Sequence, residues 1–499
     1  MERFTDLFHK PPPFVLASYG CSLGGLLLGI DTGIIGPVTV MESFNEPFGH
    51  PSPTVHGVIV SSILASAAVA SFLAGHLADR LGRPAGIAIG SMLFGIGCAI
   101  EAGAVHLGMF MAGRVVAGIG EGFTSGIMIV YICEISPAKH RGALTTGPQL
   151  LICAGLLVGF FTCYGTERIE SDLSWRLPFI LLASYSVIFS TAAYLLLPAS
   201  PRWMAHHGKP THEVSAAWET LGIHGEDQED MAEPFENAEA KASSSNIMDL
   251  FSPEARPRFF MAVFLLAMQQ FCGIDGVMYY APLLFRQAGV GVNGDTFLVS
   301  GILSIVILAV SIPGTIWADS WGRRANTIFG GLGMAGAMFI IGALYAADVV
   351  HATGPARWIV IVVIYMFTVI YCVSWGIVMK IYAAEIQPQQ TRASATSIAH
   401  GANWLTNFTV ALITPILLAS SRYGAYFLFG GCTLLTAAIC WFWMPETRGR
   451  TLSEIQRAFH ANTSSDLESS GKSIKKTPQT ASGVFVQEEE ETKQEKNQT

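Results

Sequence analysis

A single carboxylate, that of Asp31, lies in the apolar and glycine-rich segment GGLLLGIDTGIIGP at residues 24–37. A charge in an apolar segment is costly, so such a residue marks a functional site by default. Gly25, Gly29 and Gly33 recur every four residues and give one helix face that a neighbouring helix can approach closely. At about 100° per residue, Asp31 lies near the opposite side of this helix and faces away from that packing seam.

A second apolar segment carries the candidate partner of Asp31. Arg114, Gly118 and Glu121 follow at i, i+4 and i+7, so one helix face presents a cation and an acid. Arg114 can therefore neutralise Asp31, provided that the fold brings the two segments together.

Neutral amides and a tryptophan form another polar set within apolar segments: Gln149, Gln269, Gln270, Asn403 and Trp404. Residues 400–407 place a polar stripe on one helix face, made of His400, Asn403, Trp404 and Asn407. A ligand rich in hydroxyl groups needs groups that both donate and accept, with an aromatic face for its C–H surface. These residues predict a site for such a ligand. For each amide the alternative is a hydrogen bond that joins two helices.

Membrane-spanning helices must position these residues. Hydrophobic residues make up 51% of the chain and charged residues 13%, against roughly 25% charged in soluble domains, and the mean hydropathy is +0.45. The apolar segments are continuous rather than alternating, which excludes barrel strands, and each can cross a hydrocarbon core of about 30 Å. We predict an all-α membrane protein with twelve spans, at about 14–35, 55–78, 85–105, 108–133, 143–165, 177–197, 259–285, 297–318, 326–347, 358–384, 394–419 and 424–444.

The remaining composition excludes other classes of protein. All nine cysteines lie within predicted spans and none forms a CxxC pair, so neither a zinc site nor a disulfide framework is indicated. No nucleotide-binding loop, metal-ligand spacing or nucleophile motif occurs. We therefore predict that the protein is not an enzyme and has no metal, no cofactor and no nucleic-acid partner.

The chain divides into two halves. We expect a cytoplasmic N-terminus at 1–13, six-helix bundles at 14–197 and 259–445, a cytoplasmic linker at 198–258, and a cytoplasmic, largely disordered tail at 446–499. Lys and Arg gather in alternate connections, which places both termini on the cytoplasmic side. We expect the first span to be a retained helix rather than a cleaved signal peptide.

Three motifs recur in the same order in the two halves. GHLADRLGR at 75–83 matches TIWADSWGRR at 315–324, EISPAKHRG at 134–142 matches EIQPQQTRA at 385–393, and PASPRW at 198–203 matches PETRGR at 445–450. A duplicated helix bundle with its binding site at the interface of the repeats is typical of secondary transporters.

The repeated motifs place acids and arginines at matched spacing: Asp79, Arg83, Glu134 and Arg141 in the first half, and Asp319, Arg323, Glu385 and Arg392 in the second. Ion pairs at a wet interface contribute about 0–1 kcal/mol each, so they can break when two bundles move apart. We predict a cytoplasmic gate. The alternative is that the cations only mark the cytoplasmic side.

Over about residues 14–455 the chain resembles the sugar porters of the major facilitator superfamily. Besides the repeats, the resemblance rests on GRVVAGIGEG, QQFCGIDGVMYYAP and SWGIVMKIYAAEI, and the segment FTCYGT with the long acidic loop is similar to fungal members. It implies two six-helix bundles that alternate in access. In proton-coupled members an aspartate of the first span takes up the proton and an arginine of the fourth span is its partner. Asp31 and Arg114 match these two residues. The alternative to proton uptake is that Asp31 and Arg114 form a permanently ionised structural pair.

The resemblance also implies roles for the other polar residues. Gln149, Gln269, Gln270, Asn403 and Trp404 fall on sugar-contact positions, and Tyr279 and Tyr280 match an outer-gate pair. Glu121 stands where the family usually has a small or apolar residue. It is either a second proton acceptor or a group that only neutralises Arg114.

Three further positions, which matter most for the substrate, depart from the family. Asp275 replaces the usual Asn, Ile307 replaces a frequent Asn, and Lys380 replaces the tryptophan of a motif that has also lost both prolines. Lone charges at membrane depth are expensive, so in the simplest interpretation Asp275 and Lys380 compensate each other. In the other, Lys380 binds an anionic substrate such as a sugar acid. A regular helix puts Asp275 about 120° from Gln269, so Gly273 and Gly276 must unwind it if both are to face one ligand.

These observations predict a proton-coupled symporter in the plasma membrane that imports a monosaccharide, a hexose or pentose, or a related polyol. Its partners are then the sugar, the proton and the lipid bilayer. One alternative is a transporter of a sugar acid or other anionic metabolite. The other is a sugar sensor that does not transport, which the retained Asp31 disfavours.

Overall fold

The computed structural model describes residues 11–224 and 247–448, apart from 254, 292–294, 318–321, 352, 389 and 390. Asp319, residues 225–246 of the predicted linker and nearly all of the predicted tail lie outside the described residues. The described residues form helices and no strands. They contain twelve helical segments long and apolar enough to cross a membrane, and each coincides with a predicted span.

The first half builds six spans from eight helices. The first span consists of α2 and α3, and the fifth of α8 and α9. The bounds are α2 (Pro13–Ser22), α3 (Gly24–Val40), α5 (Pro53–Leu81), α6 (Arg83–Ala102), α7 (Leu107–Ile135), α8 (Ala138–Thr145), α9 (Gly147–Thr166) and α10 (Leu173–Leu196). Short helices α4 (Glu42–Phe48), α11 (Pro201–His206) and α12 (Thr211–Leu221) lie outside the spans.

Helix ends in this half follow from local sequence. α5 begins at Pro53 after Ser52, whose hydroxyl accepts a hydrogen bond from the Val55 N–H at 3.4 Å. It ends at Gly82, whose φ of +89° is a conformation that favours glycine. The sharp turn at Gly82 places Arg83 at the start of α6, close to the last turn of α5.

The second half builds six spans from eight helices, and a ninth helix, α16, lies between the seventh and eighth spans. They are α14 (Arg256–Gln270), α15 (Ile274–Tyr279), α16 (Ala281–Gln287), α17 (Asp295–Trp317), α18 (Arg323–Ala346), α19 (Ala356–Val373), α20 (Trp375–Glu385), α21 (Arg392–Ser420) and α22 (Gly424–Trp443). A short 3-10 helix, η2 (Ile247–Phe251), precedes them.

The seventh span is broken at Gly273, one of the two glycines that would have to unwind it if Asp275 and Gln269 are to face one ligand. α14 ends at Gln270, and Gly273 at φ +89° starts α15 in a new direction. A Cβ at Gly273 would lie 2.7 Å from Phe429 Cδ2, so both conformation and space require glycine. Gly276 lies inside α15 and does not unwind the chain. The tenth span breaks at Ser374, even though both family prolines are absent.

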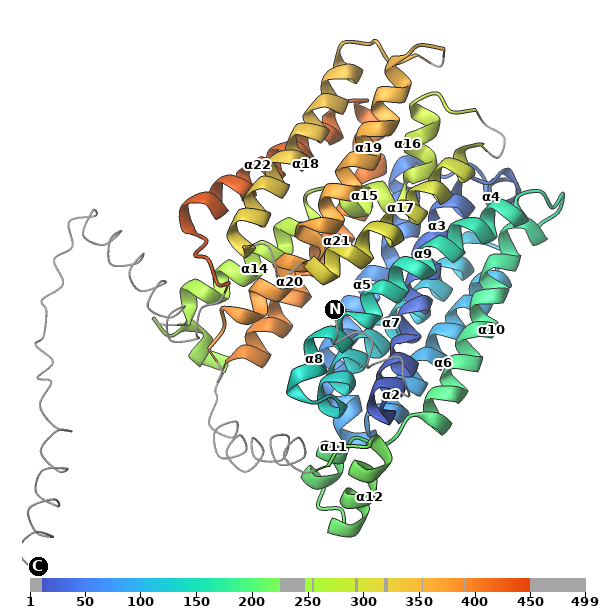
Figure 1. Ribbon diagram of the computed structural model, residues 1–499. Coiled ribbons are helices and arrows are strands. Elements are labelled where there is room, and N and C mark those ends of the chain that lie inside the picture. Colours follow the sequence, from blue (N-terminus) through green and yellow to red (C-terminus); the bar gives the residue numbers. More distant parts are fainter. Residues whose placement is uncertain are drawn as a thin grey trace, which may run out of the picture.

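The two halves form two bundles that lie side by side (Figure 1). α5 contacts α21 and α9 contacts α17 across the interface, and a separate buried apolar cluster fills each half. We call the end with the arginine-rich connections, where α8 and α11 lie, the basic end, and the end with α4 and α16 the opposite end. Figure 1 shows α8 and α11 below and α4 and α16 above.

The glycine stripe of α3 packs against the backbone of α9. A Cβ on Gly25 would meet the Pro148 carbonyl oxygen at 2.5 Å, and one on Gly33 would meet that of Leu156 at 2.5 Å. A Cβ on Gly29 would come still closer to the Ile152 carbonyl oxygen. The predicted packing seam is confirmed, and it leaves the Asp31 face of α3 free to meet α7.

Candidate functional site

Asp31 and Arg114 meet between α3 and α7. Arg114 Nη1 donates to Asp31 Oδ1 at 2.7 Å, and Nη2 donates to the Val60 carbonyl of α5 at 3.3 Å. Arg114 has no exposed surface and Asp31 is 4% exposed. The predicted pairing is confirmed, and burial makes the pair a strong and solvent-excluded contact.

Two more buried carboxyl groups surround this pair. Glu121 follows on α7 and is 6% exposed, but it forms no ion pair with Arg114 in the described structure. Glu101, on α6, lies closer: its Oε2 is 3.8 Å from Arg114 Nη1. The sequence analysis missed Glu101, although it is a lone acid in an apolar span, which is the property that singled out Asp31.

Three of the predicted amides, Gln269, Gln270 and Asn403, form one network between α14, α20 and α21. Asn403 Nδ2 donates to the Leu266 carbonyl at 2.7 Å and to Gln269 Oε1 at 3.2 Å. Gln270 Nε2 donates to Asn403 Oδ1 at 3.2 Å, and Gln269 Nε2 donates to the Trp375 carbonyl at 2.7 Å. Gln270 Oε1 and Asn407 Oδ1 are buried acceptors with no partner among the described residues. The structure thus brings these amides together. Trp404, on α21, is half-buried against the first-half cluster.

The expected contact between Asp275 and Lys380 is not observed. Lys380 Nζ instead donates to Gln149 Oε1 at 3.3 Å, across the interface from α20 to α9. Asp275 Oδ2 is buried without a hydrogen-bond partner in the described structure. The two charges still attract each other at longer range. The two side chains therefore form no direct contact in the described structure, and whether Lys380 serves Asp275 or a substrate stays open.

Tyr279 and Tyr280 lie where the halves close at the opposite end. The Tyr279 carbonyl contacts Gly36 of α3, at a place where no Cβ would fit. The Tyr280 ring lies 5.2 Å from the His56 ring of α5, and its hydroxyl donates to the Ala411 carbonyl at 2.7 Å. These contacts join α15 to both α3 and α5, so this end of the interface is closed.

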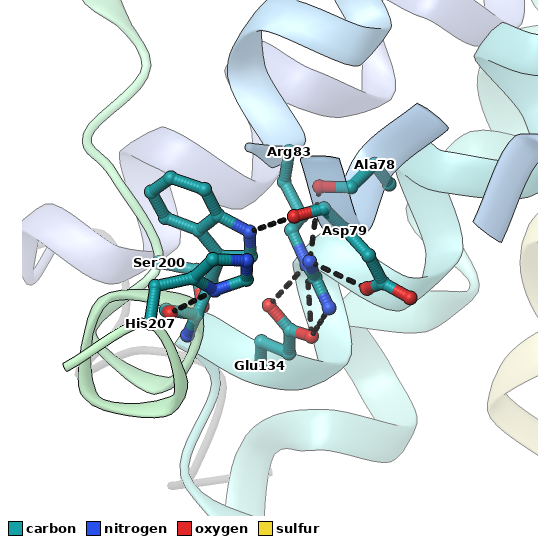
Figure 2. A network of polar contacts seen from close by, with 7 residues as sticks. Ala78, Asp79, Arg83, Glu134, Ser200 and His207 are labelled. Carbon is teal, nitrogen blue, oxygen red and sulfur yellow. Dashed lines mark hydrogen bonds and ion pairs between the residues drawn. The ribbon is translucent and has the colours of Figure 1, made fainter. Parts of the chain in front are cut away.

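At the basic end of the first half, Arg83 is held between two acids (Figure 2). Arg83 Nη1 donates to Asp79 Oδ1 at 2.9 Å, and Nη2 donates to Glu134 Oε1 at 2.8 Å. The Trp203 indole of α11 donates to the Asp79 carbonyl at 2.8 Å and fixes the end of α5. Arg141 donates to the Ser136 carbonyl at 3.3 Å.

The second half repeats this arrangement. Arg323 Nη2 donates to Glu385 Oε1 at 3.2 Å, and Arg392 donates to the Gln387 carbonyl at 3.3 Å, as Arg141 does to Ser136. Glu446 accepts from the backbone N–H of Arg323 at 2.8 Å. Each ion pair that we identify at this end, within the described ranges, joins residues of one half. The predicted gate residues therefore form two separate clusters here.

A groove of 590 Å³ lies elsewhere, between α18 and α19. Its lining is mostly apolar and includes Phe329, Ile370 and Ser374, with Phe329 67% exposed. None of the predicted site residues lines it. This groove lies on the outer surface of the second half, away from the predicted site residues. We therefore place the candidate substrate site among the polar groups between the halves.

A family model described as sugar (and other) transporter matches residues 18–459. The chain belongs to this sugar transporter family. The sugar transport protein MST7 of Oryza sativa subsp. japonica is 30% identical over 89% of this chain and 90% of its own length. A high-affinity glucose transporter of Kluyveromyces lactis is 27% identical over 92% of this chain and 88% of its own length.

Solved structures give the same family. The inward open conformation of the xylose transporter XylE from E. coli superposes with a TM-score of 0.74, at 25% identity, over 89% of this chain and 99% of that one. The proton:xylose symporter XylE bound to 6-bromo-6-deoxy-D-glucose gives 0.73 at 26% identity, over 89% of this chain and 99% of that one. The transporter is thus a multi-pass membrane protein with the two six-helix bundles of the major facilitator fold, and its relatives are transporters rather than enzymes.

Proposed function

We propose that this transporter imports a neutral monosaccharide, a hexose or pentose, or a related polyol, together with protons across the plasma membrane. The observation that carries the proposal is the buried contact of Asp31 with Arg114 at 2.7 Å. A buried carboxylate beside one cation can exchange its charge for a proton, and no solvent competes for the contact. The relatives named for glucose and for proton:xylose symport support the same assignment.

The amide network supports a hydroxyl-rich substrate. Gln270 Oε1 and Asn407 Oδ1 are acceptors that lack a donor among the described residues, and buried acceptors are costly to leave unpaired. Sugar hydroxyl groups supply such donors, and Gln149, Gln269 and Asn403 offer both donors and acceptors. Trp404 offers an aromatic face for the C–H surface of the ring.

The gates support alternating access. Tyr279 and Tyr280 close the opposite end, whereas the ion pairs that we identify at the basic end, among the described residues, each join residues of one half. We assign the basic end to the cytoplasm, with both termini, from its Lys and Arg residues. The two ionic clusters would then form the cytoplasmic gate, and this conformation is the inward-facing one.

Uptake of labelled glucose and xylose into cells that lack their own hexose transporters tests this function. We expect uptake to rise as the external pH falls, and a protonophore to abolish accumulation above the external concentration, because the proton gradient supplies the driving force. Equal uptake with and without the protonophore would contradict coupling. The absence of any flux would instead favour a sensor, and one relative is the high glucose sensor RGT2 of Saccharomyces cerevisiae, of which the chain covers 65%.

A second candidate substrate is a sugar acid. The observation that favours it is Lys380, a cation at the interface of the halves that has an amide rather than a carboxylate as its direct partner. Competition of labelled glucose uptake by neutral sugars, uronic acids and aldonic acids separates the two. We expect the neutral sugars to compete and the acids not to, and the reverse order would establish the second candidate.

Lys380→Gln is expected to raise the KM for glucose about tenfold with a smaller change in the maximal rate. The substitution removes a charged hydrogen bond that holds Gln149, and such bonds contribute about 1.5–3 kcal/mol. It also removes the long-range attraction for the buried Asp275. Initial rates of uptake over a range of glucose concentrations measure the change. Lys209→Gln, at an exposed lysine, is the matched control, and an unchanged KM in both variants would remove Lys380 from the site.

A further inference from the structure

Glu101 is a buried carboxyl group that the proposed transport cycle does not yet use. It lies one residue before the end of α6, and neither the residue nor its side chain has exposed surface. Neither carboxyl oxygen has a hydrogen-bond partner among the described residues. Its Oε2 lies 3.8 Å from Arg114 Nη1, the atom that donates to Asp31.

The packing of α6 on α7 fixes Glu101 in this place. A Cβ on Gly113 would lie 2.7 Å from Glu101 Cγ and 2.9 Å from its backbone nitrogen. Gly97 of α6 allows an equally close approach to Ala117 of α7. From α10, Arg176 donates to the Ala102 carbonyl at 2.6 Å and holds the end of α6. The close packing of the two backbones therefore holds Glu101 next to Arg114.

The charged groups around Glu101 lie on α3, α7 and α10. α3 contributes Asp31, α7 contributes Arg114 and Glu121, and α10 contributes Arg176, which has Asp172 as its own ion-pair partner at 3.5 Å. α5 contributes the Val60 carbonyl, which accepts from Arg114. Cys98 lies nearby on α6 itself. Arg114 is thus the cation that faces Asp31 and Glu101 together.

The net charge around Arg114 depends on Glu101. With Asp31 as the sole counter-ion, a proton on Asp31 would leave Arg114 as a lone buried cation, which is strongly unfavourable. With Glu101 ionised as well, Arg114 and the two carboxylates carry a net charge of −1, and a proton on Asp31 brings it to zero. Glu121 has no ion pair with Arg114 in the described residues, but it acts on Asp31 and Glu101 at longer range. It adds the same charge to the count in both states as long as its own protonation does not change.

We propose that Glu101 is a positioning residue that keeps Arg114 neutralised when Asp31 takes up its proton, and so sets the pH at which the transporter works. The inference rests on the proposed proton symport. When Asp31 is protonated, the Arg114 guanidinium moves from Asp31 towards Glu101, which lies 3.8 Å from it in this structure. When Asp31 releases the proton, the guanidinium returns, and the same proton has crossed the site.

The test uses the full chain in transporter-deficient cells, with initial rates of labelled glucose uptake measured from pH 4.5 to pH 8. Glu101→Gln and Glu101→Leu remove the charge, Glu101→Asp keeps it, and Glu46→Gln is a matched control on the exposed surface of α4. We expect both neutral variants to shift the pH of half-maximal uptake by about one unit towards acid, and Glu101→Asp to restore most of the shift. Glu46→Gln should keep the parent profile.

The outcomes separate the inference from the function on which it rests. A parent protein that ignores pH and protonophore contradicts proton symport itself, whatever the variants do. A parent that is coupled, with neutral variants whose pH profiles match it, overturns the role of Glu101 alone. Failure of both neutral variants to reach the membrane, with normal amounts of Glu101→Asp, would assign Glu101 to folding and would also overturn the proposal.

Discussion

Asp31→Asn is expected to abolish uphill accumulation of sugar and to leave sugar exchange down a gradient within a few-fold of the parent. Asparagine has nearly the same shape and can still accept the hydrogen bond that Arg114 donates at 2.7 Å, but it cannot bind a proton. Arg114 keeps Glu101 at 3.8 Å as a counter-ion, so the fold survives the loss. With a pH difference of two units, the limiting accumulation ratio falls from about a hundredfold for one proton per sugar to one.

Two assays on proteoliposomes measure this result, counterflow of labelled sugar and accumulation driven by an imposed pH gradient. Asp348→Asn is the matched control, because Asp348 is exposed and its φ of +51° suits asparagine as well as aspartate. Normal accumulation by Asp31→Asn would show that another group carries the proton. Loss of counterflow together with accumulation would instead show that Asp31 serves the sugar site or the fold.

Gly29→Leu is expected to prevent folding. Any side chain at residue 29 projects into the Ile152 carbonyl of α9, and its Cβ would also lie 2.9 Å from the Gly155 Cα of the same helix. Because the obstacle is helix backbone rather than a movable side chain, α3 and α9 must separate, which costs more than about 3 kcal/mol. That is a large share of a typical stability of about 5–15 kcal/mol, so little monodisperse protein should survive extraction into detergent.

Size-exclusion chromatography of a fluorescent fusion measures the folded fraction. Gly75→Leu makes the same substitution on α5, where a Cβ meets nothing within 4 Å and the residue is exposed. We expect this control to give the parent profile. A normal profile for Gly29→Leu would contradict the close packing of α3 against α9.

Sequence patterns located the spans because each must be continuously apolar to cross the bilayer. All twelve were predicted, and the glycine spacing in residues 24–37 placed Asp31 opposite the packing seam. Arg114 was found from a single cation in an apolar span. Glu101 is likewise a single charge in an apolar span, so the same rule could have identified it from the sequence. It was not predicted because the spacing of Arg114 and Glu121 was the stronger pattern.

The contacts between side chains of the two halves could not be predicted from the sequence. Asp275 and Lys380 looked like an ion pair because two charges replaced two neutral residues, yet Lys380 contacts Gln149. A break at Gly273 was expected if Asp275 and Gln269 were to face one ligand, but the direction in which it turns Asp275 depends on how α14 and α15 pack. Helical periodicity fixes a residue's face only within one continuous helix.

By itself, the sequence determined the fold class, the twelve spans, the repeated halves and the polar residues within them, because hydrophobicity, spacing and glycine act within a few helical turns. The tertiary structure alone decided which charges meet. It gave Arg114 two carboxylates, Asp31 at 2.7 Å and Glu101 at 3.8 Å, and left the arginines of the basic end paired within their own halves. The physical reason is that an ion pair depends on the separation of two side chains, and for residues on different helices packing alone sets that separation.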